Sequence, residues 1–72
     1  MAKEEVSFPH SSSVDRAEWD ADNGLLTVWF TTGASYNYHG INAAMWNGLK
    51  SSESAGGYLH RHIRGRFRTE RL

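Results

Sequence analysis

The sequence predicts an α+β fold: a three-stranded antiparallel β-meander followed by two short α-helices packed on one sheet face. Residues 14–19, 25–30 and 35–39 carry the alternation of apolar and polar positions that is typical of strands. Apolar residues at helical spacing occur only after these segments, within residues 42–51 and 55–64. Short turns between successive strands favour a meander, and the order of strands before helices favours the α+β class.

The 72 residues suffice for one domain with a thin core. We expect a flexible N-terminal arm over residues 1–10, the domain over residues 11–67 and a basic tail over residues 68–72. The sequence has no cysteine, which excludes disulfides and thiolate metal sites. No apolar run approaches the roughly 18 residues of a membrane span, and the first residues do not resemble a secretory signal. These features predict a cytoplasmic protein without membrane contact.

The predicted strands divide their residues between two faces of the sheet. Leu26, Val28 and Phe30 alternate with polar or opposite-facing neighbours, so we assign these three to the core. Trp29 then lies on the opposite face. In the first strand, the alternation slips between Val14 and Ala17, which a β-bulge would reconcile.

The sequence also predicts one hairpin turn and the N-terminal ends of both helices. Asn23-Gly24 suits a tight hairpin turn because both residues tolerate positive φ. Asn42 is a good N-cap for the first helix, in which Gly48 costs about 1 kcal/mol unless it permits close packing. Ser54 can cap a second helix over residues 55–64, which buries a stripe at four-residue spacing: Ala55, Leu59 and Ile63. The arginines at 61, 64 and 68 are expected along its solvent side.

The zero net charge hides an asymmetry along the chain. Residues 1–23 hold six acidic residues against Lys3 and Arg16, whereas residues 60–72 hold five arginines against Glu70. Such a basic segment indicates an anionic partner, or alternatively the two ends of the chain pair with each other within the fold.

Six short pieces, in order, resemble the KTSC domain. They are Ser11-Ser-Ser-Val-x-x-Ala-x-Trp-Asp20, Leu26-x-Val-x-Phe30, Gly33-x-x-Tyr-x-Tyr38, Met45-Trp46-x-x-Leu49, Ser54-x-Gly-x-Tyr-Leu59 and Ile63-Arg64. This domain is found at the C-terminus of some lysyl-tRNA synthetases and as a small free-standing bacterial or phage protein. The resemblance implies a binding module with RNA as a partner, although Ala55 stands where a lysine is common in the family.

Two aromatic features are candidate ligand contacts. Tyr36 and Tyr38 lie on one side of their strand. They either stack on bases, which contributes about 1–3 kcal/mol per base, or pack beneath the helices as core. Trp29 is a stacking surface, an oligomer contact or the residue on which the N-terminal arm docks.

The basic segment is the main electrostatic candidate. His60, Arg61, Arg64 and Arg66 could engage phosphates, since a guanidinium forms two hydrogen bonds with a phosphate group. The alternative is a solvated surface. Ser54, Gly56 and Gly57 form a weaker candidate anion site at a helix start, which an ordinary helix cap would also explain.

The sequence offers little basis for catalysis or metal binding. No nucleophile elbow or spaced pair of acids is present, so we predict no enzyme and no catalytic residue. His60 and His62 do not share a helix face, and we predict neither a metal nor a cofactor.

Three functional hypotheses follow. The first is a non-enzymatic module that binds RNA or another nucleic acid through the arginines and an exposed aromatic residue. The second is a protein–protein interaction module that uses Trp29 or the tail, and the third, weaker one is a small-nucleotide-binding protein. If Trp29 and the arginines fall on separate faces, the first hypothesis loses support. The sequence leaves the oligomeric state and the biological pathway open.

Overall fold

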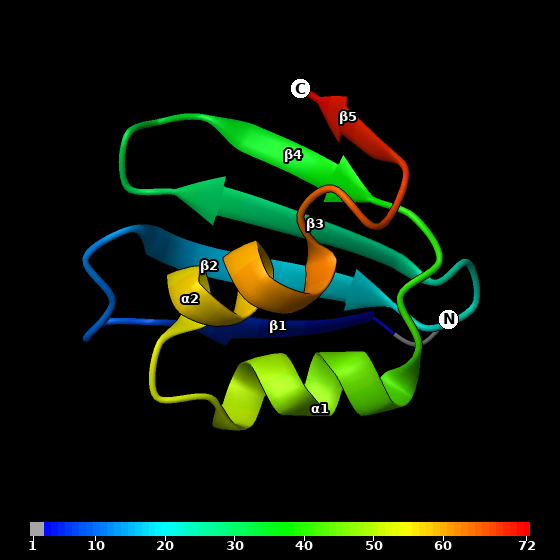
Figure 1. Ribbon diagram of the computed structural model, residues 1–72, viewed down its shortest axis with the longest axis horizontal. Helices are drawn as coiled ribbons and strands as arrows, with labels where there is room; N and C mark the ends of the chain where they lie inside the picture. The colour runs from blue at the N-terminus through cyan, green and yellow to red at the C-terminus, as the bar shows by residue number, and fades with distance from the viewer. Residues whose placement is uncertain (1–2) are drawn as a thin grey trace.

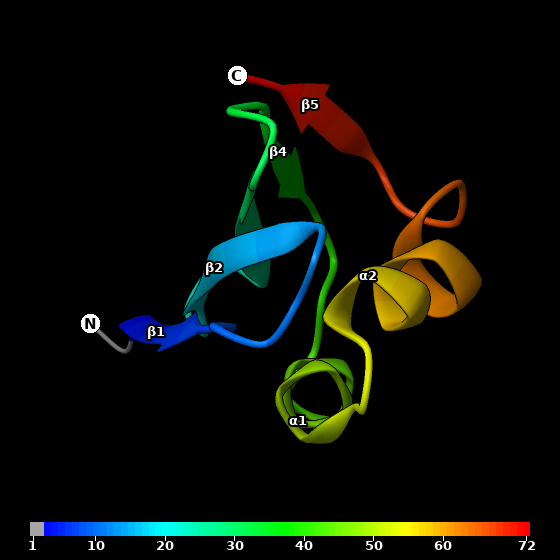
Figure 2. The same cartoon turned by 90° about the vertical axis from the view of Figure 1, so that its left-hand side faces the viewer.

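The chain forms one five-stranded antiparallel sheet with all helices on one of its faces (Figures 1 and 2). The computed structural model describes residues 3–72. The sheet order β1-β2-β3-β4-β5 follows the chain, so the strands form a simple meander. The elements are β1 Lys3–Ser7, β2 Val14–Asp20, β3 Leu25–Phe30, β4 Ser35–Tyr38, α1 Ala43–Ser51, α2 Ala55–Tyr58, the π-helix η1 Leu59–Ile63, and β5 Thr69–Arg71.

The α+β class and the meander are confirmed, but the predicted number of strands is wrong. The part of the expected arm that the structure describes contains β1, which pairs with β2 along its whole length. The expected tail contains β5, which pairs with β4. Both are edge strands with mostly exposed residues, so neither carries the apolar alternation from which a strand is recognised. Residues 1 and 2 of the expected arm lie outside the described residues.

The β2–β3 hairpin forms as its sequence predicts. Gly24 adopts a φ of 63° in the connecting turn. The register shifts between Val14 and Arg16, which is the predicted bulge. Because of that shift, Val14 and Ala17 are both fully buried on the helix-covered face.

The core lies between the sheet and the helices. Leu26 and Val28 are fully buried, as predicted. Phe30, assigned to the same set, is only half-buried and packs at the edge of the core, because it is the last residue of β3 and lines an open cavity. The buried apolar residues are Val14, Ala17, Trp19, Leu26, Val28, Tyr38, Ile41, Trp46, Leu49, Ala55, Leu59 and Ile63.

Helix α1 lies beside β1 at the edge of the sheet (Figure 1), and its Trp46 stacks on Trp19 of β2. The Asn42 side chain accepts a hydrogen bond from the Met45 backbone N–H, which confirms the predicted cap. Gly48 has the packing role that the sequence left open: a Cβ at this position would overlap the Tyr58 hydroxyl and ring. The glycine therefore allows α2 to approach α1.

The second helical segment differs from the predicted α-helix. Ser54 caps it, and Ala55, Leu59 and Ile63 are buried, both as predicted. However, only α2 is α-helical, and η1 continues as a π-helix closed by the bond from the Arg64 N–H to the Leu59 carbonyl, 2.7 Å. Arg64 itself is extended, so the expected row of arginines along one helix face does not form. Within residues 3–72, no helix is both long and apolar enough to cross a bilayer.

Candidate functional site

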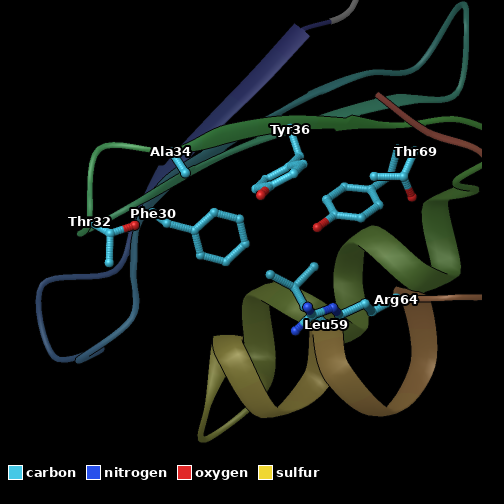
Figure 3. A pocket seen from close by; sticks show the side chains of 8 residues that line it. Phe30, Thr32, Ala34, Tyr36, Leu59, Arg64 and Thr69 are labelled. Atoms are coloured by element: carbon cyan, nitrogen blue, oxygen red, sulfur yellow. The ribbon is translucent and has the colours of Figure 1, made fainter. Parts of the chain in front are cut away.

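A cavity of about 290 Å³ opens between the end of the sheet and η1 (Figure 3). Tyr36 and Phe30 approach it from the sheet, whereas Leu59 and Arg64 approach it from the helical side. The complete lining is Phe30, Thr32, Ala34, Tyr36, Tyr38, Leu59, Arg64 and Thr69. The lining is mixed: aromatic rings, hydroxyls and one cation, with no carboxylate.

Strand register brings the rings together. Val28 pairs with Tyr36 and Leu26 pairs with Tyr38, so both tyrosines share the helix-covered face with buried β3 residues. Phe30 meets Tyr36 edge to face, with ring centroids 5.6 Å apart and an angle of 81° between planes. Tyr36 and Tyr38 have centroids 6.4 Å apart. The three rings form a continuous aromatic surface along one side of the cavity.

The two tyrosines differ in burial. Tyr38 is 4% exposed and belongs to the core, whereas Tyr36 is half-buried and keeps part of its ring open to the cavity. The core interpretation therefore holds for Tyr38, whereas a stacking role for Tyr36 stays a prediction. Burial raises the pKa of the Tyr38 hydroxyl, against an opposing effect of the nearby Arg64 charge. This hydroxyl thus remains a neutral hydrogen-bond donor around neutral pH.

The π-helix positions Arg64. An i→i+5 hydrogen bond brings residue i+5 next to residue i, so Arg64 and Leu59 both reach the cavity. In a regular α-helix, residues five apart do not share a face. Such π-turns occur frequently at functional sites, and this one supplies the only cation in the cavity lining.

Strand β5 closes the remaining side. Thr69 pairs with Tyr38, and Arg71 pairs with Tyr36. Directly paired residues of antiparallel strands project from the same face. Thr69 accordingly lines the cavity, and Arg71 lies on the same face at its border. Sequence reasoning missed Thr69 as a site residue and included Arg71 only as part of the basic segment, because β5 has no recognisable strand pattern.

The arginines of the basic segment are not neutralised by the acidic first part of the chain. Ion pairs join Lys3 to Glu18, Arg16 to Glu5, His39 to Glu70 and Lys50 to Glu4. Within residues 3–72, none of the five arginines from 61 to 71 forms an ion pair. His60, Arg61 and Arg66 are exposed, and Arg61 donates from Nε to the Gly57 carbonyl at 3.4 Å. The alternative in which the two ends pair is therefore wrong for these arginines.

Trp29 lies on the opposite face of the sheet from the cavity. Its strand neighbour Val28 faces the helices, so Trp29 faces away from them. The Arg16 guanidinium stacks over the indole at 3.8 Å from the ring centroid, and Arg16 also pairs with Glu5. Trp29 and the arginines thus do not form one surface. The stacking by Arg16 was missed because the bulge sets which residue of β2 lies opposite Trp29.

The residues of the predicted weak anion site have structural roles in the helix cap and in packing. The Ser54 hydroxyl accepts the Gly57 N–H at 3.1 Å, so the cap already uses these groups. A Cβ at Gly56 would overlap the Ser13 hydroxyl. The glycines permit the start of α2 to pack against the loop before β2, and no ligand is needed to account for them.

Comparison with known proteins identifies the family. Residues 10–67 match the KTSC domain. The chain belongs to the KTSC domain family. This KTSC domain is 31% identical over 62 residues to a protein of Tsukamurella paurometabola, covering 86% of the chain and 92% of that relative.

Two further relatives place the domain in context. A lysine–tRNA ligase of Trichormus variabilis is 28% identical over 64 residues, which is 89% of this chain but 11% of the ligase. The chain thus spans about a tenth of that enzyme's length. The crystal structure of a KTSC domain protein from Yersinia pestis superposes with a TM-score of 0.89 over 99% of both chains at 24% identity, which shows that the fold is shared.

Proposed function

We propose that this KTSC domain is a non-enzymatic binding module for RNA. The observation that carries the proposal is the aromatic cavity with Arg64 and no carboxylate in its lining. Aromatic surfaces beside unneutralised arginines are the combination that single-stranded nucleic acids require, for base stacking and phosphate binding respectively. The match to part of a lysine–tRNA ligase is consistent with an RNA partner.

Arg61 and Arg66 extend this surface beyond the cavity. Arg61 belongs to η1, and Arg66 lies in the turn after it. Arg64 lies between them in sequence and reaches the cavity. The aromatic contact is Tyr36 rather than Trp29, because Trp29 faces away from the arginines. The proposal thus keeps the arginines of the sequence hypothesis and replaces its exposed tryptophan with a tyrosine.

The test is a fluorescence anisotropy titration of labelled single-stranded RNA and of tRNA across a salt series. The wild type should bind at low salt, and log K should fall linearly with log salt concentration. Replacing Arg61, Arg64 and Arg66 together by alanine should flatten this slope by about 2, since each phosphate contact on a single strand contributes about 0.7.

A control that removes cations elsewhere comes from the opposite face of the sheet. The Lys3→Ala, Arg16→Ala variant removes two cations far from the cavity and should leave the slope nearly unchanged. Absence of low-salt binding by the wild type would reject the proposal, as would equal losses in the two variants.

A protein-interaction role has separate support on the other face. Trp29 is half-buried there against Arg16. The edge strand β5, which borders the cavity, also has exposed residues. Light scattering and a nuclease-treated pull-down test this role. A defined oligomer or protein partner lost in Trp29→Ala and kept in the triple arginine variant would favour it over RNA binding.

A further inference from the structure

We infer that the cavity receives one unpaired nucleotide, with its phosphate at Arg64 and its base against Tyr36. This inference rests on the proposed function and specifies which part of the RNA is bound. It also distinguishes the cavity from Arg61 and Arg66, which lie outside its lining and can contact phosphates along any part of an RNA strand.

The size of the cavity fits a single nucleotide. Its volume of about 290 Å³ lies near the lower end of the range of small-molecule sites, about 300–1,000 Å³. A paired base cannot enter such a space, because its Watson–Crick edge is occupied and it is stacked in the duplex. Unpaired bases in loops and at chain ends can be splayed out onto aromatic side chains.

The polar groups in the lining favour an anion. Arg64 can donate several hydrogen bonds, and within residues 3–72 it forms no side-chain hydrogen bond or ion pair. The Tyr36 and Tyr38 hydroxyls likewise form no hydrogen bond among the described residues. A neutral tyrosine hydroxyl can donate to a phosphate oxygen, and the absence of a carboxylate from the lining removes repulsion.

The aromatic side of the cavity favours a base as the second group. Tyr36 is half-buried, so part of its ring can be covered by a ligand. Phe30 stands edge-on to it and supplies a second apolar contact. Arg71, on the same face beside Tyr36, is positioned to contact the next phosphate of the chain. A base, a phosphate and a following phosphate are the parts of an unpaired nucleotide within RNA.

The experiment combines RNA binding with an NMR titration of the wild type. Nucleoside monophosphates, the corresponding nucleosides and inorganic phosphate are added separately. The monophosphates should give saturable shifts at Tyr36, Arg64 and Thr69, stronger than those from either part alone, and should compete with single-stranded RNA. Duplex RNA should not shift these signals.

Variants test the two contacts separately. Tyr36→Leu should weaken single-stranded RNA binding by roughly 5- to 150-fold, and Tyr36→Phe should retain most of it. Arg64→Gln should weaken binding of monophosphates but not of nucleosides. Trp29→Leu is the aromatic control on the opposite face and should change neither. If Tyr36→Leu does not fold, Tyr36→Phe, Arg64→Gln and the wild-type shifts still decide the matter.

The outcomes separate this inference from the proposed function. RNA binding that persists in Tyr36→Leu and Arg64→Gln, with shifts away from the cavity, would overturn the inference and leave RNA binding standing. Saturable binding of a free mononucleotide without RNA binding would support the cavity assignment and overturn the RNA proposal. A wild type that binds neither would overturn both.

Discussion

Both halves of the sheet bring aromatic rings and a cation together, but they differ in whether the polar groups there have protein partners. In the β1–β2 half, Trp19 stacks on Trp46 of α1 with ring centroids 6.0 Å apart. Both indoles donate hydrogen bonds at 2.9 Å, Trp19 to the Ile41 carbonyl and Trp46 to Glu4. The cation there, Lys50, pairs with Glu4 at 2.8 Å. Every polar group named in this half has a partner.

The β3–β5 half also brings aromatic rings and one cation together, but leaves them without such partners. The Tyr36 and Tyr38 hydroxyls and the Arg64 guanidinium face a cavity, and no carboxylate lines it. These donors have no protein partner and are open to solvent, so a ligand can replace the water that they bind. We infer that the β1–β2 half mainly stabilises the fold, whereas the polar groups of the β3–β5 half are available to a ligand.

The largest effect that tests this comparison is expected from Trp46→Ala. Trp46 is 1% exposed, and truncating a buried tryptophan costs about 3–5 kcal/mol of unfolding free energy. At about 0.05–0.15 kcal/mol per residue, a chain of 72 residues has roughly 4–11 kcal/mol in total, so the variant should lose a large share of its stability. Urea denaturation followed by circular dichroism measures the loss. Tyr36→Ala, in the other half, should lose clearly less; equal losses would contradict the division into two roles.

A smaller effect is expected from Gly48→Ala, at the contact between the helices. Alanine gains about 0.8–1 kcal/mol of helix propensity, but its Cβ would overlap Tyr58, and overpacking costs about 1–3 kcal/mol. The net change should be destabilising by up to about 2 kcal/mol. In a Tyr58→Ala background, the same substitution should instead stabilise by up to about 1 kcal/mol. Independent effects in this double-mutant cycle would show that Tyr58 does not restrict position 48.

The smallest effect concerns the pH dependence of the β1–α1 contact. Hydrogen bonds from Lys50 and Trp46 hold the pKa of Glu4 below its ordinary value of 4.5. The contribution of the Glu4 carboxylate to the free energy of unfolding is therefore fully present above pH 4.5. It is lost as the pH falls through the lowered pKa. Glu4→Gln should lower the urea midpoint near pH 7, and the difference from wild type should shrink toward pH 3. The Glu53→Gln variant is a control, because the exposed Glu53 side chain forms no hydrogen bond or ion pair among the described residues. A difference that is constant with pH would contradict this role for Glu4.

Much of the fold could be predicted because local patterns decide it. The alternation in Leu25–Phe30, the Asn42 and Ser54 caps and the slip in phase at Val14 each have a local physical cause, and each is confirmed. The two edge strands could not be predicted in this way. They have mostly exposed side chains, and their pairing depends on the strand beside them rather than on their own sequence.

The candidate site was predictable only in part. Tyr36, Tyr38 and Arg64 were candidates, but nothing local indicated that the three would line one cavity. That juxtaposition depends on the π-turn of η1 and on β5, both consequences of tertiary packing. For Trp29, the face of the sheet was predicted correctly. Its contact with Arg16 was not, because that contact depends on a cross-strand register that the sequence does not reveal.

The bulge in β2 divides that strand into two segments of opposite phase. Before it, Val14 faces the helices at an even position; after it, Ala17 and Trp19 face them at odd positions. The extra residue therefore allows even-numbered residues before the bulge and odd-numbered residues after it to face the helices. Asp15 is the residue without a partner across the β2–β3 ladder, so deleting it would place Val14 and Ala17 two positions apart in a regular strand. Both side chains would then still face the helices, without the local bend of the bulge.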